Sequence, residues 1–172
     1  AVLEYLGEPD YGCKHCLAKS PDCKVLCTYS FLVGVSGAAS FLSWKEGWHG
    51  DNVAPFYMSA DAAAPERRIF RAIGYEHEWV MKEPGRDNEG LFRERIAESI
   101  ARGMPVLGYG VIGPPEASII AGYDEGGDVL IGWNFFQGMP EFSAGVEFEP
   151  AGNGHGAGYY RRRDWFKDTE CL

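Results

Sequence analysis

The chain has 172 residues, of which 45% are hydrophobic and 14% aromatic, and this composition predicts a single globular domain, residues 1–172, that can bury a core. A formal net charge of −9 argues against binding to nucleic acid or to anionic membranes, because both attract basic surfaces. The sequence contains no long apolar run and no signal-peptide pattern, so we expect a cytoplasmic protein that does not span a membrane.

Residues 1–7 have the character of the last turns of a helix that ends at Gly7, since glycine is favoured just beyond a helix C-terminus. No capping residue precedes this helix in the sequence. We therefore expect the amino terminus to be truncated, with part of the helix upstream of Ala1.

A cysteine-rich insert follows at residues 10–27. Its four thiols are Cys13, Cys16, Cys23 and Cys27. The Cys-x-x-Cys spacing suits two ligands of a tetrahedral zinc ion, and the second pair would complete a four-thiolate site. Two alternatives remain open at this point: one or two disulfides, or thiols that pair with nothing.

Residues 27–41 are dominated by small side chains, which predicts an element that packs closely along a central cleft. An aromatic and polar loop follows at 44–52. Its candidate ligand-binding residues are Trp44, Trp48 and His49, and His49 is also the best candidate for a functional histidine. The alternative is that the tryptophans cover the edge of the core.

Two amphipathic helices are predicted farther along the chain. The first spans residues 61–74, with Asp61 as its cap, and the second spans 88–102, with Asp87 or Asn88 as its cap and Gly103 at its end. The alternating segment 75–81 between them predicts a strand. Near the carboxyl end, residues 159–166 resemble a strand whose three arginines form a solvated, partly paired face.

The segment 102–137 organises the fold, because it predicts three consecutive strands. Residues 104–111 form the first strand and include Tyr109, a candidate ligand-binding side chain. Residues 117–123 and 129–133 form a hairpin around the glycine-containing turn 124–128, and we expect 117–123 to be buried on both faces. Antiparallel pairing then brings Glu116, before one strand, near Asn134, after the next.

This hairpin, with its Gly122-Tyr123-Asp124 motif and glycine turn, resembles papain-like cysteine peptidases of the bacteriocin-processing type and their relatives around butirosin biosynthesis protein H. The resemblance covers residues 85–137 best. It implies an α+β fold in which an amino-terminal helical part packs on an antiparallel sheet. It also implies a catalytic histidine six residues before Gly122, and that position holds Glu116.

The resemblance further implies that an orienting Asn or Asp ends the return strand, where Asn134 and Gln137 are the candidates. The nucleophilic cysteine would lie at the start of the first helix, upstream of Ala1. The hypothesis is therefore a non-catalytic papain-like domain whose cleft binds a small-molecule or peptide ligand through Glu116. The alternatives are a thiol peptidase or acyltransferase with its nucleophile upstream, and a zinc-stabilised regulatory domain.

Overall fold

A computed structural model describes residues 2–8, 23–40, 46–47, 61, 63–114, 116–149 and 158–172. The chain divides into two compact units: Leu3–His77, and Glu78–Leu172 together with Ala1–Val2. Helices and an antiparallel sheet are both present, so the fold is α+β as the sequence predicts.

The unit Leu3–His77 is helical. Its described helices are α1 (Val2–Tyr5, which begins one residue before the unit), α2 (Cys23–Ser36), the short 3-10 helix η2 (Ala38–Ser40) and α3 (Ala64–Ile73). Arg68 of α3 donates a hydrogen bond of 2.8 Å to the carbonyl oxygen of Ser36 at the end of α2. The link satisfies one of the carbonyl groups that every helix end leaves without an internal partner.

The predicted helix at 61–74 is confirmed, although its cap is not. α3 begins after Ala63, which provides no side-chain cap, and the carboxylate of Asp61 pairs instead with Arg67. Gly74 ends the helix in the left-handed conformation, at φ 81°, which only glycine adopts without cost.

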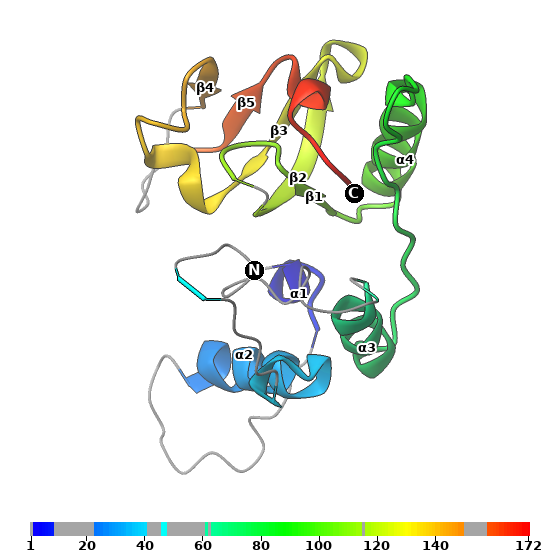
Figure 1. Cartoon of the computed structure of the whole chain (residues 1–172), viewed down its shortest axis with the longest axis vertical. Coiled ribbons are helices and arrows are strands. Elements are labelled where there is room, and N and C mark those ends of the chain that lie inside the picture. Colours follow the sequence, from blue (N-terminus) through cyan, green and yellow to red (C-terminus); the bar gives the residue numbers. More distant parts are fainter. Residues whose placement is uncertain are drawn as a thin grey trace. The chain divides into compact units, whose positions relative to one another are not determined.

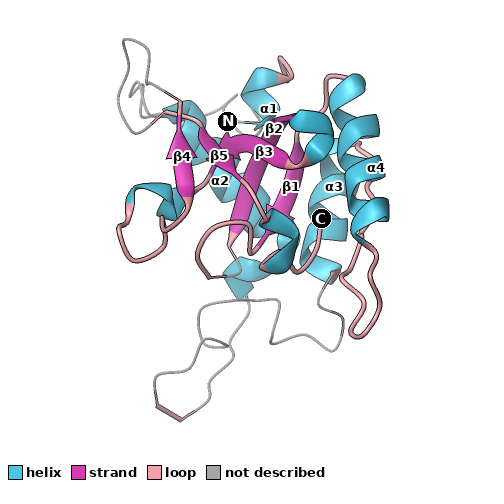
Figure 2. Cartoon of the chain, turned by 90° about the horizontal axis from the view of Figure 1, so that it is seen from above, coloured by secondary structure: helices cyan, strands magenta, loops and turns pink. Residues whose placement is uncertain are grey.

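The unit Glu78–Leu172 contains one long helix and one sheet. The helix α4 spans Glu89–Ala101, and its first free amide, that of Glu89, is bound by the Asp87 carboxylate. The sheet order is β1-β2-β3-β5-β4, and every neighbouring pair is antiparallel (Figure 2). The strands are β1 (Val106–Tyr109), β2 (Ala117–Asp124), β3 (Val129–Trp133), β4 (Val146–Phe148) and β5 (Tyr160–Arg162).

The predicted hairpin is confirmed. β2 and β3 pair from Ile119↔Trp133 to Asp124↔Val129, with a bulge between Ile120 and Gly122. Their connection is the 3-10 turn η5 (Glu125–Gly127), in which the Asp124 side chain accepts a hydrogen bond from the Glu125 amide.

The two faces of the sheet differ in burial. The inner face contains the fully buried side chains of Ile120, Leu130 and Tyr160, and α4 contributes Phe92 and Ile96 to the same core. On the outer face of β2, Ala117 and Ala121 are exposed and Ile119 is half-buried. Burial of β2 on both faces was therefore a wrong prediction, because the apolar side chains of this strand fill a core on one side only.

Residues 75–81 were predicted as a strand, and this is also wrong. The segment is extended but irregular, and its ladder is limited to residues 80–82, which pair with the last residues of the chain. Val80 and Leu172 exchange two backbone hydrogen bonds, of 3.1 and 2.9 Å. The same terminal segment bonds to Tyr109 of β1, and it ends beside that strand in Figure 1.

None of the helices in the described ranges has the length and apolarity that crossing a bilayer requires.

Candidate functional site

One end of the sheet gathers the residues that the sequence singled out. β1 ends there at Tyr109, β2 begins there after Glu116, and β3 ends there at Trp133. β5 begins and β4 finishes at the same end, because Tyr160 pairs with Gly132 on one side and with Phe148 on the other. The hairpin turn η5 lies at the opposite end of β2 and β3.

Asn134 is fully buried at this end, and both atoms of its amide are engaged. The Nδ2 group donates to the Ser118 hydroxyl at 2.8 Å. The Oδ1 atom accepts from the Phe136 amide at 2.7 Å and caps the 3-10 helix η6 (Phe135–Gly138). An amide with its donor and acceptor satisfied inside the core has a structural role, because breaking either bond would leave a buried polar atom without a partner.

Gln137 completes this arrangement. Its Oε1 atom accepts from the Asn134 backbone amide at 2.9 Å, which makes a capping box, and its Nε2 group donates to the Gly158 carbonyl at 2.7 Å. Gln137 therefore ties the end of β3 to the segment that leads into β5.

Tyr160 is buried next to this polar group. Burial raises the pKa of Tyr160, and the neighbouring Ser118 hydroxyl opposes that effect only in part. The Tyr160 hydroxyl makes no well-formed hydrogen bond to a described residue. The neutral phenol is thus the form that the core holds, and Tyr160 is not poised to act as a base.

Glu116 lies in the turn just before β2 and is exposed. Its backbone amide donates to the Pro114 carbonyl at 2.5 Å, while its side chain makes no ion pair or hydrogen bond with a described residue. We expected Glu116 and Asn134 to be neighbours, but the Asn134 amide is bonded to Ser118, two residues farther along β2. The register explains the difference, since Ile119 pairs with Trp133 and thereby aligns Ser118 with Asn134.

Three aromatic side chains at the same end of the sheet are exposed. Trp133 is 48% exposed, Phe135 66% and Tyr159 57%. Trp133 lies across from Ile119 on the outer face, and Tyr159 lies one residue before Tyr160, which pairs with Gly132. We call Trp133, Phe135 and Tyr159 the aromatic end of the sheet.

The carboxylates near the aromatic end include Glu116 and Glu149. The Glu149 amide donates to the Tyr159 carbonyl at 2.8 Å, so the backbone of Glu149 lies beside that of Tyr159 at this end of the sheet. Arg161 binds both Glu149, at 3.1 Å, and Asp124, at 2.6 Å, and the Arg161 hydrogen bond lowers the pKa of Asp124.

The other two arginines of the cluster are also paired, as the sequence predicted. Arg163 makes two hydrogen bonds to Glu125, of 2.6 and 2.5 Å, which lower the pKa of the Glu125 carboxyl group. Arg162 pairs with Asp168 at 2.8 Å. None of the three arginines is therefore left over to hold an anionic ligand.

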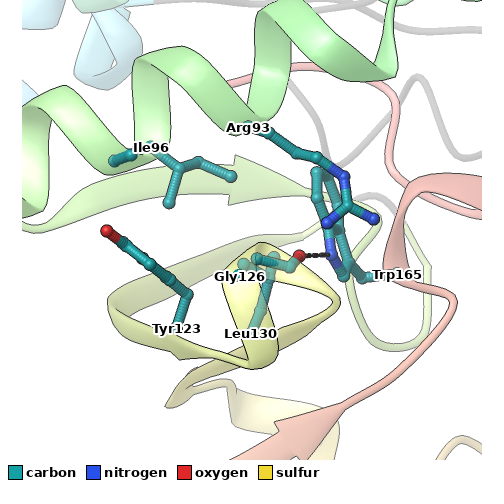
Figure 3. A pocket seen from close by; sticks show the side chains of 8 residues that line it. Arg93, Ile96, Tyr123, Gly126, Leu130 and Trp165 are labelled. Carbon is teal, nitrogen blue, oxygen red and sulfur yellow. Dashed lines mark hydrogen bonds between the residues drawn. The ribbon is translucent and has the colours of Figure 1, made fainter.

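A small cavity lies at the other end of the sheet, between α4, the hairpin turn and Trp165 (Figure 3). Its volume is about 20 Å³, which fits a water molecule but no metabolite. Arg93 lines it and pairs with Glu89 and Asp128, while Trp165 donates its indole hydrogen bond to the Gly127 carbonyl at 2.9 Å. These contacts fix the turn to α4 and give the cavity no ligand-binding character.

The remaining predicted site residues divide into two groups. Tyr109 is half-buried and its ring stacks on Trp79 at 5.8 Å, so it contributes to packing. Cys27 is half-buried in α2. The others fall outside the described residues or have side chains that do: Trp44, Trp48, His49, Cys13, Cys16 and Cys23. Within the described ranges, no group of three metal-ligating side chains occurs.

Sequence reasoning missed five residues of this region: Ser118, Trp133, Phe135, Tyr159 and Tyr160. The alternation of β2 was a usable signal for Ser118, since it shares a face with Ile120. The exposed rings could not be found from composition, because an aromatic residue in a strand is more often buried.

Comparison with known proteins finds no matching family model, no matching curated protein and no matching solved structure.

Proposed function

We propose that this chain is a papain-like domain that binds a small ligand or peptide at the aromatic end of its sheet and does not catalyse a thiol reaction. The single observation that carries the proposal is the bonding of Asn134. A thiol enzyme of this type needs a base held in orientation by a third group. Here the orienting amide is used within the core, by Ser118 and Phe136.

The second support is chemical. Glu116 stands where the resemblance expects an imidazole, and it is exposed. A carboxylate cannot form the ion pair that activates a thiolate, because two anions disfavour each other's charge. The same carboxylate is suited to bind a ligand instead, through a charge-assisted hydrogen bond.

The third support is the exposure of Trp133, Phe135 and Tyr159 at one end of the sheet. Clustered exposed rings on a soluble protein mark interaction sites, since isolated apolar residues are common on surfaces but groups of large ones are not.

Thiol reactivity tests the absence of catalysis. The protein is treated with iodoacetamide at pH 7, and the alkylation rate of each of the five cysteines is followed by peptide mass spectrometry. We expect every thiol to react no faster than free cysteine. One cysteine that reacts much faster would reveal a low-pKa nucleophile within residues 1–172 and would contradict the proposal that this chain does not catalyse a thiol reaction.

A screen of small molecules of mixed charge tests the binding itself. The protein is labelled with 5-fluorotryptophan, and the Trp133 signal is assigned by its loss in the Trp133→Phe variant. We expect at least one compound to shift the Trp133 signal while the buried Trp165 signal stays in place. Shifts confined to other tryptophans would place any binding site elsewhere and contradict the proposal.

A further inference from the structure

The two edges of the sheet differ in how their backbone groups are used. At the β1 edge, residues 170–172 bond to Tyr109 on one side and to residues 80–82 on the other. The Met81 carbonyl beyond them accepts a hydrogen bond of 2.9 Å from the Asn88 side chain. The opposite edge is β4, which among the described strands pairs with β5 alone (Figure 2). An edge strand with unused backbone groups is a template for a further strand.

The alternation of the β4–β5 ladder decides which backbone groups face this edge. The Glu149 amide donates to the Tyr159 carbonyl at 2.8 Å. Two residues earlier, Glu147 pairs with Arg161. In an antiparallel ladder, alternate residues bond to the same neighbour, and the residues between them point their N–H and C=O groups to the other side. Phe148 therefore directs both backbone groups away from β5, and neither makes a hydrogen bond to a described residue.

The edge is short, which limits what can pair with it. Val146 also faces the edge, but its amide already donates to the Ser143 carbonyl at 3.0 Å. Residue 150 is a proline and has no amide to donate. Among the described residues, the edge thus offers the amide and carbonyl of Phe148 and the carbonyl of Val146. A short antiparallel segment can satisfy all of these groups.

The side chains of β4 select the chemistry of that segment. Glu147 is exposed, lies on the same face as Arg161 and forms no ion pair with a described residue. The pKa of Arg163 is raised mainly by its hydrogen bonds to Glu125 and also by the charge of Glu147, so Glu147 lies near that guanidinium without pairing with it.

Phe148 is 39% exposed, on the face that it shares with Tyr160. A segment that sets a basic residue opposite Glu147, with β-branched apolar residues on both sides of it, gains a cross-strand ion pair and a contact with the Phe148 ring.

A second copy of this chain fits the edge poorly. If Phe148 paired with Phe148 of the other copy, each Glu147 would face a Glu149. If Phe148 paired with Val146 instead, the two Glu147 side chains would face each other. Like charges directly opposed across two strands are destabilising, and the net charge of −9 favours a basic partner over another acidic one.

We infer that β4 is a docking edge for a short, extended peptide segment of basic character, which pairs with it in the antiparallel sense and extends the sheet by one strand. The inference goes beyond the proposed function and does not depend on it, because the edge uses Val146, Glu147 and Phe148 and none of the rings of the aromatic end. Backbone hydrogen bonds provide the affinity, and Glu147 provides the preference for a basic residue.

Matched peptides test the pairing. The parent is acetyl-Thr-Val-Lys-Val-Thr-amide, and a second peptide has Glu in place of Lys. A third carries N-methyl groups on both valines, whose amides are the donors in the inferred pairing. A fourth is methylated on the lysine amide, which would point away from β4. Each is titrated into protein that contains ¹⁵N-labelled phenylalanine, and the Phe148 amide signal is assigned by its loss in the Phe148→Leu variant.

We expect the parent peptide to shift the Phe148 amide signal and to slow the exchange of that amide with water. The glutamate peptide should bind about fivefold more weakly, since it replaces an opposed pair of unlike charges with a like pair. Methylated valines should abolish the shift, whereas the methylated lysine should be tolerated.

A charge reversal locates the basic residue. Glu147→Lys should invert the preference, so that the glutamate peptide binds more tightly than the parent. The control is Glu94→Lys, which changes the net charge equally at an exposed position of α4 and should leave the preference as it is.

The outcomes separate this inference from the proposed function. No change at the Phe148 amide with the parent peptide up to about 10 mM, roughly tenfold above a millimolar dissociation constant, overturns the inference. Equal binding of the valine-methylated peptide overturns it too. A Phe148 shift that grows with protein concentration in the absence of peptide would identify a second copy as the occupant instead. Peptide-induced shifts at Phe135 but not at Phe148 would overturn the docking edge and support binding at the aromatic end.

Discussion

At the same end of one sheet, the inner and outer faces each hold residue types that are unusual for their degree of exposure. On the inner face, the polar groups of Ser118, Asn134 and Gln137 are buried and bonded to one another or to the backbone. On the outer face, Trp133 and Tyr159 are large and apolar, yet exposed. Polar residues in the core and apolar residues at the surface both depart from the usual distribution. The first departure is explained by satisfied hydrogen bonds, whereas the second has no explanation within the described residues and supports the proposed binding site.

The largest effect is expected where the inner face is most tightly packed. A Cβ atom at Gly132 would lie 2.1 Å from the Ile119 carbonyl oxygen and 2.8 Å from the Tyr160 hydroxyl. Because Ile119 is held by the β2–β3 ladder, Gly132→Ala should lower the free energy of unfolding by about 3 kcal/mol or more. Urea unfolding measures this. Gly90→Ala is the control: no atom lies within 4 Å of its added Cβ, and it should stabilise α4 by about 0.5–1 kcal/mol.

The adjacent residues Asn134 and Phe135 distinguish a structural role in the core from an exposed position at the surface, and this difference is expected to give the next largest effect. Asn134→Ala removes the partners of the Ser118 hydroxyl and the Phe136 amide, so it should cost about 2–3 kcal/mol of unfolding free energy. Phe135→Ala, one residue later and exposed, should cost less than about 0.5 kcal/mol. If Asn134→Ala were as mild as Phe135→Ala, the inner polar group would not be structural and Asn134 would be available for a site.

A smaller effect is expected at the hairpin end of the inner face. Trp165→Phe keeps an aromatic ring in the core but removes the indole hydrogen bond to the Gly127 carbonyl. We expect a loss of about 1–2 kcal/mol in urea unfolding, since the carbonyl is left with one partner fewer. Retained binding of a compound that shifts the Trp133 signal would show that the small cavity beside Trp165 plays no part in ligand binding.

The smallest effect concerns the exposed ion pairs near the turn. Arg163 lowers the pKa of Glu125, so the stabilisation that the pair contributes is present above the ordinary pKa of a glutamate and is lost as pH falls through the lowered one. Glu125→Gln should therefore flatten the decline of thermal stability between about pH 5 and pH 3. An unchanged pH profile would show that the Arg163–Glu125 pair contributes nothing measurable to stability.

The sequence predicted the sheet better than the site. The hairpin around residues 124–128 was predictable because Gly126 and Gly127, both at positive φ in the turn, are bounded by short apolar strands. α4 was predictable because Phe92 and Ile96 lie on one face of a capped helix. β4 was not, since three residues between irregular segments carry no periodic signal and pair only because β5 lies alongside.

Predicting the candidate site requires the exact pairing register of β2 and β3, and the sequence does not specify that register to within one residue. Placing Glu116 beside Asn134 was an error of two residues along β2, and Ser118 occupies the position instead. Side-chain alternation makes any such shift matter, because it decides which residues face each other across the strands. The exposure of Trp133 could not be predicted from the alternation of β3 either. Ile131, two residues earlier on the same face, is half-buried.

The most direct test of this account measures two quantities on one variant, Trp133→Ala. The account predicts that binding of the screened compound that shifts the Trp133 signal is lost, while the free energy of unfolding in urea changes by less than about 1 kcal/mol, because the exposed ring contributes little to the core. A loss of about 3 kcal/mol or more, the cost of removing a buried tryptophan, would show that the ring is part of the core and contradict the account.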